Sequence, residues 1–337
     1  MSEKPVRAQT NGQASAPTTM AGKAVDVVTF GETMALMKST NPGPLAHETT
    51  LGLGIGGAES NVAIALRRLG ATVAWAGRVG QDSLGDLVLR QLRAEDLILH
   101  SRQDPGAATG LMIKERRTAE STKVMYYRAG SAGSRLCPQD LPAELITGAR
   151  LLHITGITPA LSASAAEAVT FAVQQARAAG TLVSFDLNYR QALWSKEDAA
   201  VAFRSLIEQA DVVFAGDDEA AIVVGEASDP HQLAARIAEL GPAQVIIKLG
   251  AQGAVALVAG ETFTQPAIPI SAVDTVGAGD AFVAGYLAEL LLGEPVGTRL
   301  LTAAQTGAFA CLVPGDWEGM PRRSELNLLN ASEPVSR

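Results

Sequence analysis

The chain has 337 residues, of which 47% are hydrophobic and 18% charged, so it can bury a sizeable core in one large domain or two smaller ones. Its formal net charge is −8 and its basic residues do not cluster, which argues against a nucleic-acid partner. The two cysteines and four histidines form no disulfide or zinc pattern, and no apolar run is long enough to span a membrane, so we expect a cytoplasmic protein without a membrane partner.

Most of the chain alternates between short β-rich runs and Ala-rich stretches with helical spacing. Residues 1–23 are rich in Ser, Thr, Ala, Gln and Pro and predict a disordered leader. Strands are expected at 25–30, 71–76, 151–155, 181–186, 211–215 and 244–249, and helices at 60–69, 83–94, 163–178, 199–209 and 233–240. This alternation predicts an α/β fold with a central, mostly parallel sheet and helices on both faces. Ligands of such folds bind beyond the carboxyl ends of the strands.

Two segments interrupt the alternation. Thr33–Thr50 contains Pro and Gly and is not helical, and Gly110–Arg128 is typical of a hairpin with a polar turn. We expect these regions, about residues 33–50 and 107–128, to form a small β-sheet lid over the main sheet. Ordinary surface excursions are the alternative.

Gly52–Gly57 matches the spacing of a dinucleotide-binding loop and precedes a helix. No buried strand comes immediately before it, so we reject the dinucleotide interpretation. Close backbone approach to a small ligand is the better hypothesis, and a flexible turn is the alternative. Glu59 and Asn61, just inside the helix, can bond hydroxyl groups, although Asn61 could equally cap the helix.

The strongest signal is the stretch from Asp274 to Leu292. Gly277, Ala278 and Gly279 precede a helical run, and a helix N-terminus offers unpaired N–H groups to an anion. Asp280 lies in the first turn, where we expect the local field to lower its pKa and keep it ionised. A carboxylate beside an anion site can take the proton of an attacking hydroxyl during phosphoryl transfer. Stabilisation of the helix dipole alone is the alternative.

Polar residues follow other predicted strands. No Walker-type phosphate loop is present, but Lys248 leads into a glycine-rich turn that fits nucleotide approach. Asp186 and Arg190 end another strand, where they either face a ligand or pair with each other. Arg128, at the end of the lid hairpin, could reach a carboxylate. Glu219 begins a helix, where it either stabilises the helix dipole or has a role near magnesium.

Two stretches resemble the signatures of the ribokinase (PfkB-type) sugar kinases. Asp274–Asp280 is similar to the C-terminal signature and Gly56–Asn61 to the N-terminal one, and the resemblance extends over about residues 25–320. Within this family the chain is most similar to the 2-keto-3-deoxygluconate kinases. The shared stretches are 31–32, 126–131, 153–158, 186–190 with 193–194, and 315–316.

The resemblance implies a ribokinase-like fold over residues 24–325, a C-terminal tail at 326–337, and transfer of the ATP γ-phosphate to a primary hydroxyl. It implies that Asp280 is the base and that the amides of Gly277, Ala278 and Gly279 form the anion hole. The implied ATP contacts are Asn188, Lys248, Gly250, Ala251, Gly253, Gly277 and Gly279. The implied acceptor contacts are Gly57, Asn61, Tyr127, Arg128, Arg190, Asp280 and Asp316.

The expected substrate is a sugar acid. Arg128 and Arg190 both come from predicted site edges and suit a carboxylate, which favours 2-keto-3-deoxygluconate over neutral sugars. Mg²⁺ is the expected metal, with Glu219 near it. Gly216 departs from the family pattern because it stands where Asn is usual, and Asp217 or Asp218 could compensate.

Other functions stay open on the sequence alone. The acceptor could be fructose, 5-keto-2-deoxygluconate or ribose, or the chain could be a non-catalytic sugar sensor. The exposed edge of the lid favours pairing with a second copy, so we also expect a homo-oligomer.

Overall fold

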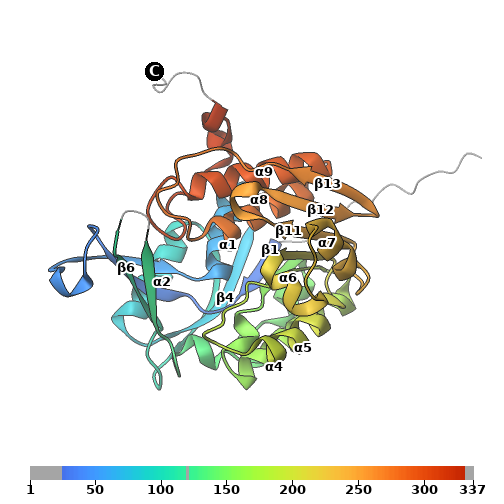
Figure 1. Ribbon diagram of the computed structural model, residues 1–337. Helices are drawn as coiled ribbons and strands as arrows, with labels where there is room; N and C mark the ends of the chain where they lie inside the picture. Colours follow the sequence, from blue (N-terminus) through green and yellow to red (C-terminus); the bar gives the residue numbers. More distant parts are fainter. Residues whose placement is uncertain (1–24, 119–120, 331–337) are drawn as a thin grey trace, which may run out of the picture.

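The computed structural model of the protein describes residues 25–118 and 121–330 (Figure 1). Within these residues the main sheet has nine strands, and all neighbouring pairs are parallel except those made by β12. In spatial order the strands are β13 (Glu261–Gln265), β12 (Ala254–Val258), β11 (Gln244–Lys248), β10 (Val212–Gly216), β9 (Leu182–Asp186), β8 (Ala149–Thr155), β1 (Val25–Phe30), β4 (Val73–Gly80) and β5 (Ile98–Asp104).

Helices cover both faces of this sheet, as the alternation predicts (Figure 1). One face packs against α1 (Ala58–Arg68), α2 (Ser83–Ala94), α8 (Ala278–Leu292) and α9 (Val296–Ala310). The other packs against α3 (Ala143–Thr147), α4 (Ala163–Ala179), α5 (Lys196–Ile207), α6 (Asp217–Val224) and α7 (Pro230–Ala238). The central strands are therefore apolar on both sides, and the sheet divides two hydrophobic cores.

The hydrophobic pattern predicted most of these elements to within a few residues. The helix expected at 83–94 has those bounds, and the strand expected at 244–249 ends one residue earlier. Sequence reasoning missed the edge strand β5, whose residues are largely half-buried or exposed, and helix α9. An edge strand lacks the continuous apolar run that marks a buried one.

A second sheet of four strands forms the lid, in the order β3 (Leu51–Gly56), β2 (Met34–Ser39), β6 (Leu111–Arg116) and β7 (Thr122–Tyr127). The β6–β7 hairpin is confirmed, and β2 pairs with β6 in parallel. The glycine-rich stretch after Thr50 is strand β3, which pairs antiparallel with β2. The flexible turn considered for these glycines is therefore wrong, because Leu51, Leu53 and Ile55 alternate in a strand pattern.

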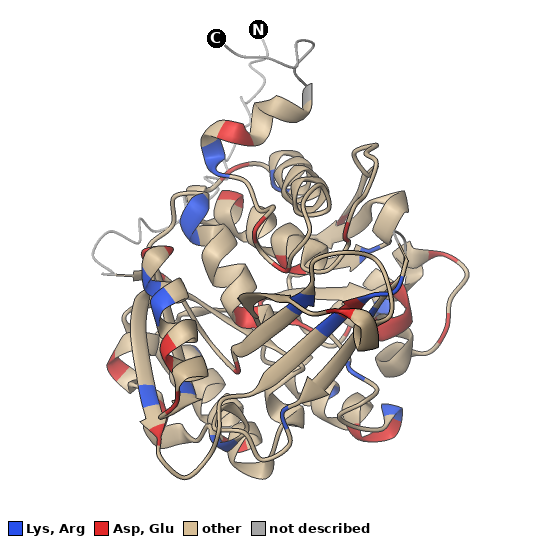
Figure 2. Cartoon of the chain, turned by 90° about the vertical axis from the view of Figure 1, so that its left-hand side faces the viewer, with Lys and Arg blue, Asp and Glu red and all other residues tan. Residues whose placement is uncertain are grey.

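The described residues include part of the predicted tail and none of the predicted leader. The predicted leader, residues 1–23, and residues 331–337 of the predicted tail lie outside the described residues. The tail prediction also includes Leu326, which lies in a 3₁₀ segment at Arg323–Asn330 and is buried against the core. Basic and acidic positions are interspersed along the drawn chain (Figure 2), and no described helix is long and apolar enough to cross a membrane.

Candidate active site

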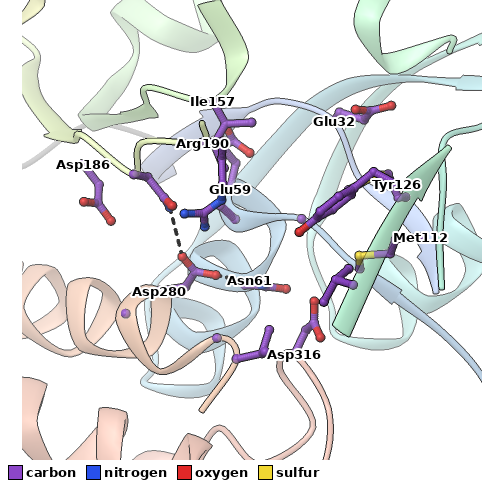
Figure 3. Close-up of a pocket in the computed structure, with 18 of the residues that line it drawn as sticks. Glu32, Glu59, Asn61, Met112, Tyr126, Ile157, Asp186, Arg190, Asp280 and Asp316 are labelled. Atoms are coloured by element: carbon purple, nitrogen blue, oxygen red, sulfur yellow. Dashed lines mark hydrogen bonds between the residues drawn. The ribbon is translucent and has the colours of Figure 1, made fainter. Parts of the chain in front are cut away.

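A cavity of about 430 Å³ lies between the lid and the carboxyl ends of the main-sheet strands. Figure 3 shows Met112 and Tyr126 of the lid on one side and Asp186 and Asp280 on the other. The predicted site residues that line it are Gly57, Asn61, Arg128, Asn188, Arg190, Glu219, Lys248, Gly277, Gly279, Asp280 and Asp316. The carboxyl-end rule for parallel sheets thus placed the cavity correctly.

The floor of the cavity is the N-terminus of α8. Gly277 has φ of 80°, and a Cβ there would lie 1.8 Å from the carbonyl oxygen of Asp316. Only glycine fits this left-handed, closely packed position, and it turns the chain into the helix that begins at Ala278. The first amides of α8 have no partner within the helix, so the turn presents donors to an anion. Of the three predicted amide donors, Gly277 and Gly279 line the cavity, whereas Ala278 does not and its N–H donates to the carbonyl of Thr275 at 3.3 Å.

Asp280 is buried in the first turn of α8 and is held by two amide side chains. Asn61 Nδ2 donates to Asp280 Oδ2 at 2.8 Å, and Asn188 Nδ2 lies 3.4 Å from Oδ1. Burial raises the pKa of Asp280 to about 7, against the lowering by Asn61, Arg190 and Lys248. The predicted fall in its pKa is therefore wrong, because the loss of hydration outweighs the field of the helix end. Asn61, considered as a helix cap, instead orients this carboxylate.

Lys248 brings a buried cation to the same end of the cavity. Its Nζ donates to both carboxylate oxygens of Asp186, at 2.7 and 2.9 Å, and a Cβ on Gly279 would lie 3.9 Å from Nζ. Burial alone would lower the pKa of Lys248, but Asp186 and Glu219 raise it. The alternative pairing of Asp186 with Arg190 is not formed, since Arg190 donates to the carbonyl of Tyr189.

The lid side of the cavity carries Arg128. Its Nε and Nη2 donate to Oε2 of Glu32 at 2.7 and 2.6 Å, and Ser131 Oγ donates to the other oxygen of Glu32. Sequence reasoning gave Glu32 no role in the site, although it belongs to the stretch shared with the sugar-acid kinases. The pair fixes the guanidinium at the cavity wall.

Tyr126 lines the cavity, whereas the predicted acceptor contact Tyr127 does not. Successive side chains of a strand point to opposite faces, so Tyr126 and Arg128 share the cavity face. Tyr127 is 60% exposed. The aromatic contact therefore shifts by one residue, and the Arg128 guanidinium lies over the Tyr126 ring, 5.8 Å from its centroid.

The turn after β11 is set back from the cavity. Gly250, Ala251 and Gly253 do not line it, and Lys248 is the only predicted residue of that segment, among those the structure describes, that does. A Cβ on Gly253 would lie 2.0 Å from the carbonyl oxygen of Gln265, so packing against β13 already requires glycine there. Their nucleotide contact stays a prediction.

Both carboxylate oxygens of Glu219 accept hydrogen bonds from backbone amides. Its Oε1 accepts from Tyr189 N at 2.8 Å and its Oε2 from Gly216 N at 2.7 Å. Among the described residues no group of three or more His, Cys, Asp and Glu side chains is placed to hold a metal ion. Asp218 also lines the cavity, so two carboxylates of α6 face it.

Asp316 and the buried acid Glu59 complete the wall. Asp316 Oδ1 accepts from Lys114 Nζ at 3.0 Å. Glu59 accepts from the hydroxyls of Thr155 and Thr158, both at 2.6 Å, and burial raises its pKa despite these bonds. The sequence suggested that Glu59 bonds the hydroxyls of a ligand. In the structure it bonds two hydroxyls of the protein itself.

Comparisons with known proteins agree with this geometry. The family model described as pfkB family carbohydrate kinase matches residues 24–323. The chain belongs to the pfkB family of carbohydrate kinases. It is therefore a sugar kinase, a phosphotransferase whose acceptor is an alcohol group, and its fold is ribokinase-like.

Two curated relatives are similar over most of their length. The 2-dehydro-3-deoxygluconokinase of Bacillus subtilis is 36% identical over 92% of this chain and 97% of its own. The 2-dehydro-3-deoxygalactonokinase of Haloferax volcanii is 36% identical over 86% of this chain and 92% of its own. A solved structure of a putative ribokinase II from E. coli, in complex with ATP and Mg²⁺, superposes with a TM-score of 0.84 at 26% identity, over 91% of this chain and 99% of that one.

Proposed function

We propose that this pfkB kinase transfers the γ-phosphoryl group of ATP to the 6-hydroxyl of 2-keto-3-deoxygluconate. The observation that carries the proposal is Arg128, whose side chain is 11% exposed and which Glu32 fixes at the acceptor side of the cavity. A planar guanidinium binds carboxylates in a defined geometry, and a neutral sugar would not use it. Arg190 lines the same cavity, and both curated relatives described above are named for 3-deoxy-2-keto sugar acids.

The reaction assigns one role to each end of the cavity. Asp280 takes the proton of the primary hydroxyl as that oxygen bonds to the γ-phosphorus, and the bond to the β,γ-bridging oxygen breaks to release ADP. The amides of Gly277, Ala278 and Gly279 and the ammonium of Lys248 stabilise the charge that develops on the phosphoryl oxygens. A base with a pKa of about 7 accepts this proton well at neutral pH.

The residues present fit a magnesium ion that the nucleotide brings. Mg²⁺ keeps several waters and binds through substrate phosphates and one or two carboxylates, so it needs no cluster of protein ligands. Glu219 and Asp218 face the cavity, with Glu219 already bonded to two amides, and they would hold the ion through water. When bound, the ion neutralises charge on the β- and γ-phosphates.

An ATP-consumption screen tests the acceptor. We expect the highest kcat/KM on 2-keto-3-deoxygluconate, with fructose, ribose and 5-keto-2-deoxygluconate at least about tenfold lower. The galactonate epimer is included because of the Haloferax relative. A neutral sugar as the best acceptor would refute the sugar-acid assignment. Binding of sugar without turnover by any acceptor would favour a sensor.

We also propose that the kinase self-associates through its lid in the cytoplasm. Leu53 on β3 and Tyr127 on β7 are both 60% exposed, and these are the two edge strands of the lid. Exposed edges and apolar side chains favour pairing between copies. Sedimentation showing only monomer at micromolar concentration would contradict this assembly.

A further inference from the structure

Lys114 is a buried cation that bridges three distant segments. It lies on lid strand β6 and is 5% exposed. Its Nζ is 2.8 Å from Asp274 Oδ2 and 3.0 Å from Asp316 Oδ1. One ammonium therefore joins the lid to the turn before α8 and to the loop that carries Asp316.

Asp274 organises the phosphate turn around this ammonium. Its Oδ1 accepts from Val276 N at 3.2 Å, and its Oδ2 accepts from Gly315 N at 3.2 Å. The next residue of the turn, Gly277, packs on the carbonyl of Asp316. A shift of Lys114 would thus move the amides at the helix end and the acceptor-side carboxylate together.

Burying the Lys114 ammonium with two carboxylates costs hydration free energy, so stability of the fold alone does not explain this triad. A buried ion pair loses several kcal/mol of hydration per ion, and apolar residues of similar size often stabilise a fold equally well. Burial alone would lower the pKa of Lys114, but Asp316 and Asp274 raise it, so the cation persists. A triad of this kind at the edge of a reaction cavity points to a role in the reaction.

We propose that Lys114 is a positioning residue that couples the lid to phosphoryl transfer. With β6 in place, its ammonium holds the Asp274 turn, and through it the Gly277–Gly279 amides, in the geometry that binds the phosphoryl group. The same ammonium holds the Asp316 carboxylate in place for the acceptor. This inference uses the kinase chemistry of the family and does not depend on which sugar is the acceptor.

Lys38 offers a matched control on the neighbouring lid strand. Its Nζ contacts Glu318 Oε1 at 2.5 Å, so it also ties the lid to the C-terminal loop. Both side chains of that pair are 26% exposed, and Lys38 touches neither Asp274 nor Asp316. Lys38→Met therefore removes a lid-to-loop ion pair while leaving both Lys114 contacts in place.

The test compares Lys114→Met, Lys114→Arg and Lys38→Met with the acceptor that the unaltered enzyme uses best. We expect Lys114→Met to lower kcat at saturating ATP and acceptor about 10–100-fold and to raise the acceptor KM, because hydrogen bonds to charged groups are lost. Lys114→Arg should recover most of both parameters. Lys38→Met should stay within about twofold of the unaltered enzyme.

A pH profile separates positioning from mere stability. Lys114 lowers the pKa of Asp316 against the rise that burial causes, so without the ammonium Asp316 retains a proton to higher pH and the acceptor KM of Lys114→Met should improve as pH rises. A purely structural role would lower Tm and leave the KM profile of the folded enzyme unchanged. That result, or a loss of kcat no larger than in Lys38→Met, would overturn the proposal.

If Lys114→Met does not fold, Lys114→Gln takes its place in the same comparison. Failure of both neutral variants to fold, with Lys114→Arg folding and acting as the unaltered enzyme does, would also overturn the proposal. Failure of the acceptor assignment appears separately, in the sugar screen of the unaltered enzyme.

Discussion

Asp280 and Asp316 are two buried aspartates on one cavity with different partners. Asp280, on the main-sheet side, is bonded to the neutral amides of Asn61 and Asn188. Asp316, on the lid side, is bonded to the ammonium of Lys114. Amides leave the cost of burying a charge largely unmet, whereas an ammonium offsets it. Burial raises the pKa of both carboxyls, to about 7 for Asp280, and for Asp316 the Lys114 ammonium acts against this rise.

The largest effect should come from Asp280→Asn. Removing a general base costs about 10²–10⁴-fold in rate, so kcat should fall by that order while ATP binding is retained. Asp316→Asn should instead raise the acceptor KM more than it lowers kcat. Steady-state kinetics of both variants, with the surface variant Asp86→Asn as control, checks this. Near-normal turnover by Asp280→Asn would remove Asp280 from the mechanism.

The next effect concerns acceptor charge on the lid side. Arg128→Ala should lower kcat/KM for a sugar acid about 10²-fold more than for a neutral sugar, because only the acid loses a charge-assisted hydrogen bond. The test compares the two losses in kcat/KM, because Arg128→Ala also leaves Glu32 buried without its cation and so lowers kcat/KM for both substrates. Arg102→Ala, on exposed β5, is the control. Equal losses on both acceptors would contradict the carboxylate argument.

The pH dependence of kcat/KM gives a third, smaller test. Asp280 acts as a base when deprotonated, so kcat/KM should rise with pH and level off above about pH 7. The Asn61 hydrogen bond lowers this pKa. Asn61→Ala should therefore move the rise to higher pH. A midpoint that stays in place would mean that Asn61 does not set the protonation of the base.

The last effect concerns stability and not rate. The folded pKa of Asp280, about 7, lies above its ordinary value of 3.8, so the folded state loses stability as pH rises between these values. Asp280→Asn avoids this loss. At pH 8 the variant should have the higher Tm, with a free energy of unfolding up to about 4 kcal/mol larger than that of the unaltered protein. Near pH 4 the two Tm values should match. An equal Tm difference at both pH values would contradict a buried, titrating Asp280.

Local sequence signals predicted the Asp280 side of the cavity better than the lid side. The strand ends, Gly277, Gly279 and Asp280 line one cavity, as expected, because helix starts and parallel sheets follow short-range rules. The direction of the Asp280 pKa shift was wrong, since burial depends on the whole fold. Lys114 was missed because its partners lie 160 and 202 residues away in the chain. Tyr127 was chosen over Tyr126 because the sequence does not state which face of β7 meets the cavity.

The lid connects to the body of the enzyme at four points, after β1, before α1, before β6 and after β7. Three of these junctions carry acceptor-side residues, namely Glu32, Gly57 and Arg128. The phosphoryl-transfer residues lie on other segments, at the ends of β9 and β11 and at the start of α8. On the proposed function, part of the acceptor preference therefore lies in these short junctions, and part lies with Arg190 and Asp316 outside the lid. Exchanging them between pfkB kinases is a route to new acceptors that leaves the chemistry of ATP untouched.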